Sequence, residues 1–299
     1  MKSIFVLVAL SANFAFGQQY SLALNLEAGK TYSFTINSTN HFSGEMDGQK
    51  MTMTSAMTGF MKFKVVKSSA IDYELEASYD TLHLAVKSSM GNMEFSTGNS
   101  SGPSNMMSSR HFNITVLKNG AVSKIDNPDT TGFMSMMKNF PMAQGLKQML
   151  MGPLKKSFSK ESMKENIEKL TAIFPNKKVS LNESWGSVIQ PDSASGNTVK
   201  TSYQLISYAS GIATIKGHSE SKAKSNNKQR SGFGFMFPLV YDLEGESESN
   251  IQVSAQTGWV KEASIKNELK GNVKMNDPNS KQPKSGPIQM DGNVVISSY

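Results

Sequence analysis

Apolar and polar residues alternate with a period of two along most of this chain, and no other feature restricts its fold as strongly. The pattern is clear in residues 32–36, 71–77 and 112–116, where every second residue is apolar. Such alternation is typical of strands with one buried face and one solvated face. The third run leads into Asn119-Gly120, a dipeptide that accepts the positive φ angles of a hairpin turn. The sequence therefore predicts an antiparallel sheet.

The period changes in the middle of the chain. Apolar residues between residues 131 and 150 follow helical spacing on both sides of Pro141, and a proline interrupts a helix. A second helix is predicted from a capping box at residues 162–165, and Pro175 would end it. Its apolar stripe consists of Met163, Ile167, Leu170, Ile173 and Phe174.

The second half of the chain repeats the first. Residues 63–75 correspond to residues 203–215 at an offset of 140, and residues 113–116 correspond to residues 250–253 at an offset of 137. We therefore expect a mainly β (α+β) fold, with a large curved antiparallel sheet or half-barrel built from two pseudo-repeats. A central helical pair would pack on one face of it. The expected segments, within one compact unit, are 1–17 (signal peptide), 18–128 (N-terminal β half), 129–175 (helical segment) and 176–299 (C-terminal β half).

The first 17 residues have the three parts of a secretory signal peptide. Lys2 supplies the positive charge, residues 4–10 are apolar, and Ala15-Phe16-Gly17 fits the small residues before a cleavage site. The apolar run is too short to span a bilayer. We expect cleavage near Gly17, a mature chain without a transmembrane segment, and a periplasmic or secreted location. The chain has no cysteine, which excludes disulfides and a lipidated cysteine.

The sequence contains no motif of an enzyme or of a nucleic-acid-binding protein. The sequence has no cysteine and no Gly-x-Ser-x-Gly elbow that would supply a catalytic nucleophile. The net charge of +7 comes from dispersed lysines and arginines rather than from a basic patch. We therefore predict a non-enzymatic protein with no metal, no cofactor and no nucleic-acid partner. The histidines match no metal-ligand spacing; they are His41, His83, His111 and His218.

Methionine is unusually frequent, with 20 residues, and three interpretations remain open. Methionine fills irregular core space, it ligates Cu(I) through its thioether, and it forms adaptable walls for apolar ligands. The copper interpretation draws on two methionine groups and predicts that Cu(I) uptake is lost when Met51 and Met53 become Leu. The groups are Met51, Met53, Met57 and Met61, and Met134, Met136 and Met137. The ligand interpretation places a wall between sheet and helices, formed by Met61, Phe63, Phe133, Met137, Phe140 and Met149.

These features favour a binding protein for an apolar ligand, such as a lipid or acyl chain, or for a protein partner. Two alternatives stay open. One is a structural or interaction protein of the cell envelope that uses strand edges and loops. The other is Cu(I) binding by methionines.

Four segments of the chain carry a resemblance to known proteins. They are the predicted mature start at Gln18, the Leu-Asn-Leu-Glu-x-Gly-Lys-Thr-Tyr opening at residues 24–32, the methionine-rich residues 46–61, and Asn182-Glu183-Ser184-Trp185. With these segments the chain resembles a family of secreted proteins of unknown function from Bacteroidota. The resemblance implies export and fold but no chemistry. The layout is also distantly similar to half-barrel carriers of lipoproteins or lipids in the periplasm, an architectural similarity that does not fix function.

Overall fold

The computed structural model describes residues 18–46, 48–89, 91–96, 111–126, 159–192, 197–224, 239–275 and 284–298. Strands dominate these ranges. The elements are β1 (Gln19–Tyr20), β2 (Thr31–Met46), β3 (Gln49–Ser68), β4 (Asp72–Ser88), β5 (Gly91–Ser96), β6 (His111–Leu117), β7 (Val122–Asp126), α4 (Lys160–Thr171), β8 (Val179–Ser180), β9 (Ser184–Asp192), β10 (Asn197–Ala209), β11 (Ile212–Lys224), β12 (Leu239–Ser254), β13 (Val260–Met275) and β14 (Lys284–Ser298).

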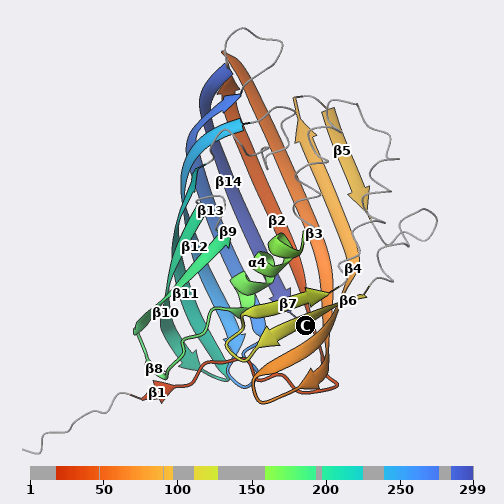
Figure 1. Ribbon diagram of the computed structural model, residues 1–299, viewed down its shortest axis with the longest axis vertical. Helices are drawn as coiled ribbons and strands as arrows, with labels where there is room; N and C mark the ends of the chain where they lie inside the picture. The colour runs from red at the N-terminus through yellow and green to blue at the C-terminus, as the bar shows by residue number, and fades with distance from the viewer. Residues whose placement is uncertain are drawn as a thin grey trace, which may run out of the picture.

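Twelve of the strands form one large antiparallel sheet, and the fold is mainly β as the alternation predicted. The strand order is β7-β6-β4-β3-β2-β14-β13-β12-β11-β10-β9, and β5 pairs with the far part of β4. The sheet is not closed, because β7 and β9 stand at opposite ends of this order. Figure 1 shows the sheet curving around α4, which lies on its concave side. β1 and β8 pair separately as a two-stranded sheet.

The register of the sheet follows the repeat seen in the sequence. The order β2-β3-β4-β6-β7 in one half has the same form as β9-β10-β11-β12-β13 in the other. Phe63 pairs with Ala77, and Tyr203 pairs with Gly217, so both partners keep the offset of 140. The two halves meet at the centre, where β2 pairs with β14.

The helix α4 begins and ends earlier than the sequence predicted. Its last residue is Thr171, so Ile173 and Phe174 of the expected stripe lie beyond the helix and are buried there. Its N-cap is Ser159, whose side-chain oxygen accepts a hydrogen bond from the Ser162 N–H at 3.2 Å. The expected start at Ser162 was wrong, because the serine three residues earlier already satisfies that free N–H group. The expected helical pair is described only in part, since the predicted helix at residues 131–150 lies outside the described residues. No helix in the described ranges has the length and apolarity needed to cross a bilayer.

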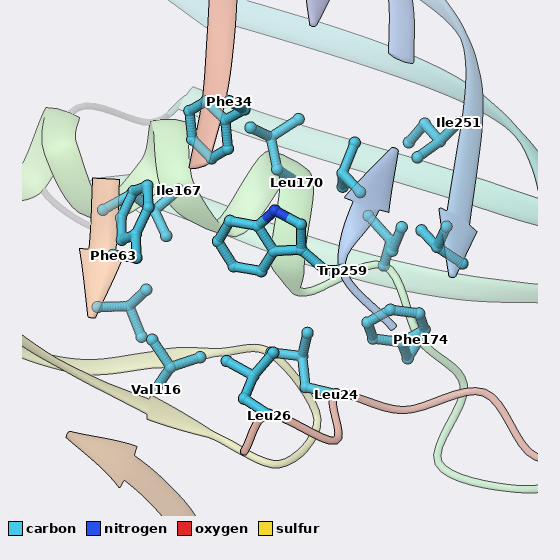
Figure 2. Packing of buried hydrophobic residues seen from close by; sticks show 14 of the residues in the cluster. Leu24, Leu26, Phe34, Phe63, Val116, Ile167, Leu170, Phe174, Ile251 and Trp259 are labelled. Atoms are coloured by element: carbon cyan, nitrogen blue, oxygen red, sulfur yellow. The ribbon is translucent and has the colours of Figure 1, made fainter. Parts of the chain in front are cut away.

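The core lies between α4 and one end of the concave face, with Trp259 at its centre (Figure 2). Trp259 is 5% exposed, and its ring lies 5.5 Å from that of Phe63 and 5.8 Å from that of Phe34. The segment before β2 closes this end with Leu24 and neighbouring leucines. Tyr73 Oη fixes that segment by donating to the Leu24 carbonyl oxygen at 3.0 Å. Burying each large apolar side chain here contributes about 1.5 to 3 kcal/mol.

Candidate functional site

The concave face of the sheet and α4 enclose a cavity of about 460 Å³. It lies beside the packed core, and its wall comes from β2, β3, β4, β13, β14 and the helix. Most of this wall is apolar, as expected where alternating strands turn their apolar side chains to one face. The apolar lining consists of Phe34, Ile36, Met53, Met57, Gly59, Met61, Leu82, Leu84, Val86, Met163, Ile167, Leu170, Ile265, Val294 and Ile296, with Tyr79 at one side.

Helix α4 forms one wall of the cavity and is fixed by contacts with the β6–β7 hairpin. Gly120, in the hairpin turn, has φ +88°, and a Cβ there would lie 1.6 Å from the Thr171 carbonyl oxygen. The Thr171 hydroxyl donates to the Gly120 carbonyl oxygen at 2.6 Å. The Val122 N–H donates to Glu168 Oε1 at 2.8 Å. Glycine at the turn is therefore required for the close approach that places the helix over the sheet.

A row of uncharged polar residues, with a glycine at its β14 position, crosses the concave face between apolar stretches of the strands. Its members are direct register partners on successive strands, from β10 to β3. They are Thr201, Ser219, Ser247, Asn267, Gly292, Asn40 and Ser55. Three of them, Asn267, Asn40 and Ser55, line the cavity. In the described part of the chain, the side chains of Asn40 and Asn267 form no hydrogen bond.

The cavity lining carries little charge. Among its described residues, Lys169 near the end of α4 is the one charged side chain. Burial raises the pKa of Tyr79 to about 12, so its phenol is neutral at physiological pH. The described residues contain no group of three or more His, Cys, Asp or Glu placed to hold a metal ion. This wall is suited to apolar and hydrogen-bonding contacts rather than to acid–base chemistry.

The opposite face of the sheet is charged. Glu246 pairs with Glu268, and Glu268 pairs with Asp291, so three carboxylates stand side by side on neighbouring strands. A second hollow of about 510 Å³ lies over them and is also lined by Glu248 and Lys266. Acidic side chains alone do not define a site. The hollow shows only that the face of the sheet behind the polar row is negatively charged.

Comparison with known proteins identifies a family. The model of a family of unknown function, DUF6263, matches residues 70–260, from the turn before β4 to the first residue of β13. The chain belongs to the DUF6263 family. The family has no assigned function, as the resemblance in the sequence implied, and the export of this DUF6263 protein remains a prediction. No curated protein matches the chain.

Several solved structures show a low similarity to this DUF6263 protein. An outer membrane channel from Pseudomonas putida F1 is 8% identical, with a TM-score of 0.27 and coverage of 92% of this chain and 97% of the channel. OccK7 from Pseudomonas aeruginosa is 7% identical, with a TM-score of 0.20 and coverages of 91% and 99%. A DUF1329 family protein from Desulfovibrio piger is 9% identical, with a TM-score of 0.15 and coverages of 89% and 83%. Scores this low carry no argument about function.

The structure places two of the six predicted wall residues of this DUF6263 protein. Met61 lines the cavity, whereas Phe63, two residues further along β3, is 1% exposed and packs in the core against Trp259. The other predicted residues lie outside the described ranges; they are Phe133, Met137, Phe140 and Met149.

Sequence reasoning missed most of the cavity wall. Met53 and Met57 were part of the methionine-rich segment and share the alternation of Met61, so the period-two pattern could have added them. Alternation places Asn40 and Asn267 on the apolar face of their strands, but a single polar residue that interrupts such a face is no signal of a site.

Proposed function

We propose that this DUF6263 protein is a non-enzymatic binding protein whose concave cavity takes an elongated apolar ligand, such as a lipid or acyl chain. One observation carries the proposal: the described side chains of the sheet and α4 leave an apolar cavity of about 460 Å³ between them. Cavities that bind small ligands are typically about 300 to 1,000 Å³ and are mostly apolar. Its size and lining match that class.

The methionines of β3 support a ligand with a variable shape. Met53, Met57 and Met61 are spaced four residues apart on the cavity face of one strand. Unbranched, polarizable methionine side chains adapt to irregular apolar surfaces. Neighbours at this spacing lie about 13 Å apart along a strand, so their positions suit contacts along a chain better than ligation of one Cu(I) ion.

The signal peptide predicted at residues 1–17 supports action outside the cytoplasm, in the periplasm or after secretion. An apolar molecule crossing an aqueous compartment needs its surface covered, because exposing that surface costs about 25 cal/mol per Å². A protein with a cavity between sheet and helix provides such cover. This proposal is tested independently by locating the processed chain in cell fractions.

Binding is tested with a fluorescent apolar probe, N-phenyl-1-naphthylamine, titrated into the purified protein. We expect saturable binding that oleic acid or a phospholipid extract competes away. Replacing Met57 by Trp places an indole in the cavity and should weaken probe binding roughly tenfold or more. Thr58→Trp is the matched control, because Thr58 is the next residue of β3 and is exposed on the opposite face.

Absence of saturable probe binding to the wild-type protein, together with a lipid-free extract of protein purified from its native cells, would remove the proposal. Equal weakening in the Met57→Trp and Thr58→Trp variants would show that the probe binds elsewhere. Circular dichroism and unfolding curves of both variants establish that the comparison is made between folded proteins.

A further inference from the structure

The polar row crosses the apolar concave face, and a purely apolar ligand would not require it. Asn40 and Asn267 belong to the polar row and lie on either side of Gly292, the β14 residue that pairs with both. A Cβ at position 292 would lie 2.7 Å from Asn40 Oδ1 and 3.5 Å from Asn267 Nδ2. The glycine thus leaves room for the two amides to approach each other above the sheet.

The levels on both sides of this row are predominantly apolar. Two residues further along the strands in one direction, direct register partners are Leu269, Met290, Phe42 and Met53. Two residues from the row in the opposite direction, the direct register partners are Ile265, Val294, Ser38 and Met57. The apolar wall continues from there to Phe34, six residues from Asn40 and about 20 Å away along β2. The polar row therefore crosses a long apolar surface rather than marking its end.

A wholly apolar ligand lying across the row would remove both amides from water without replacing their hydrogen bonds. An amide buried without a partner costs about 1 to 3 kcal/mol. A ligand that carries its own hydrogen-bonding group at this level avoids that cost. The amides offer it both donors and acceptors, since each side chain has an NH₂ group and a carbonyl oxygen.

The charges near the row disfavour an anionic group. None of the polar side chains in the row is charged, and the single cation among the described lining residues, Lys169, belongs to α4 beside the core. On the opposite face, Asn267 has Lys266 and Glu268 as its neighbours in sequence, and Gly292 has Asp291. Glu246 and Glu248 line the same hollow, so among the described residues four carboxylates outnumber the one lysine behind the row. Their field opposes a carboxylate or phosphate at this level.

We propose that Asn40 and Asn267, on either side of Gly292, together with Ser55, the β3 partner of Asn40, bind an uncharged ester or amide group that has apolar chain on both sides. The inference rests on the proposed function and specifies its ligand as a long-chain ester or amide rather than a free fatty acid. The carbonyl oxygen of the ligand accepts hydrogen bonds from the asparagine NH₂ groups, and the two apolar arms lie along the levels above and below.

The test compares ligands of similar length that differ in one group, each competing with N-phenyl-1-naphthylamine. They are decyl decanoate, N-decyl decanamide, eicosane, eicosanoic acid and eicosylamine, all delivered from cyclodextrin complexes. For the wild-type protein we expect the ester and the amide to compete roughly tenfold better than the hydrocarbon, which corresponds to one or two neutral hydrogen bonds. The acid should also compete less well than the ester.

The variant Asn40→Leu/Asn267→Leu should lose this preference while binding eicosane at least as well as the wild-type protein does, which also shows that its cavity is formed. Gly292→Ala, whose methyl group crowds Asn40 Oδ1, should reduce the preference in part. Asn293→Leu is the matched control, since residue 293 lies on the opposite face of β14, and it should keep the preference intact.

A wild-type protein that binds all five ligands equally, or that prefers the acid or the amine, would overturn this inference and leave apolar binding in the cavity standing. The same holds if the double leucine variant retains the preference for the ester. A wild-type protein that binds none of the ligands and no dye would overturn the proposed function itself.

Discussion

Substituting Gly120 by alanine tests how the cavity wall is assembled. Gly120 has φ +88°, a conformation that costs a residue with a Cβ about 1 to 2 kcal/mol. The added methyl would lie 1.6 Å from the Thr171 carbonyl oxygen, where ordinary contact begins at 3.4 Å. The β6–β7 turn and the end of α4 must therefore separate by more than an ångström.

That separation breaks two hydrogen bonds between hairpin and helix. The bond from the Thr171 hydroxyl to the Gly120 carbonyl oxygen, 2.6 Å long, contributes about 1 kcal/mol. The bond from the Val122 N–H to the Glu168 carboxylate, 2.8 Å long, contributes about 1.5 to 3 kcal/mol because its acceptor is charged. Together with the backbone cost, Gly120→Ala should lower the free energy of unfolding by about 3.5 to 6 kcal/mol.

The matched control is Gly29→Ala. Gly29 has φ +81°, but a Cβ there would meet nothing within 4 Å. Gly29→Ala therefore measures the backbone cost of a Cβ at positive φ, about 1 to 2 kcal/mol, without a steric clash. Urea unfolding is followed by the fluorescence of Trp185 and Trp259, both of which pack on the main core. Equal destabilisation by the two variants would refute the close packing of hairpin and helix.

Three further outcomes follow from the described contacts. Gly258→Ala should destabilise the protein more than Gly29→Ala does in the same urea assay, because its Cβ would lie 2.2 Å from the Ala23 carbonyl oxygen. Trp185→Phe should cost about 1 kcal/mol by calorimetry, because the indole N–H donates to a backbone carbonyl just after α4 at 3.0 Å, and an unchanged melting temperature would contradict this. The hydrogen bond to Glu248 raises the pKa of His218 above its usual 6.5. This pair therefore stabilises the fold below about pH 6.5 and loses its effect as the pH rises through the raised pKa, so melting temperatures of wild-type and His218→Gln protein should converge at high pH.

Period-two patterning predicted the sheet well because the alternation within each strand shows which of its residues are buried. In β4, Tyr73, Leu75 and Ala77 are buried as the alternation predicted. Ile71, the apolar residue that begins the same run, is 70% exposed, because the chain turns between β3 and β4 at that point and β4 begins only at Asp72. The pattern thus identifies the face of a residue but not the residue at which pairing begins.

The repeat in the sequence predicts the register between neighbouring strands as well as the strands themselves. Because residues 63–75 and 203–215 match at a constant offset, a hairpin register found in one half predicts the register in the other, and β3–β4 and β10–β11 agree. The pairing of β2 with β14 has no counterpart within either half, since it joins strands from opposite ends of the chain. Local alternation and the internal repeat therefore predict each half but not the junction between them.

The polar row depends on that junction. Asn40 and Asn267 lie more than 200 residues apart in the sequence and come together only because β14 is inserted between their strands with Gly292 level with both. Each asparagine, taken within its own strand, looks like an interruption of the apolar face. Only the register of three strands shows that the interruptions align. A one-residue slip of β14 would turn Gly292 to the opposite face and place a side chain between the two amides. Any ligand specificity of this row is therefore a property of strand register, and substitutions that shift the register of β14 should change it even when both asparagines remain.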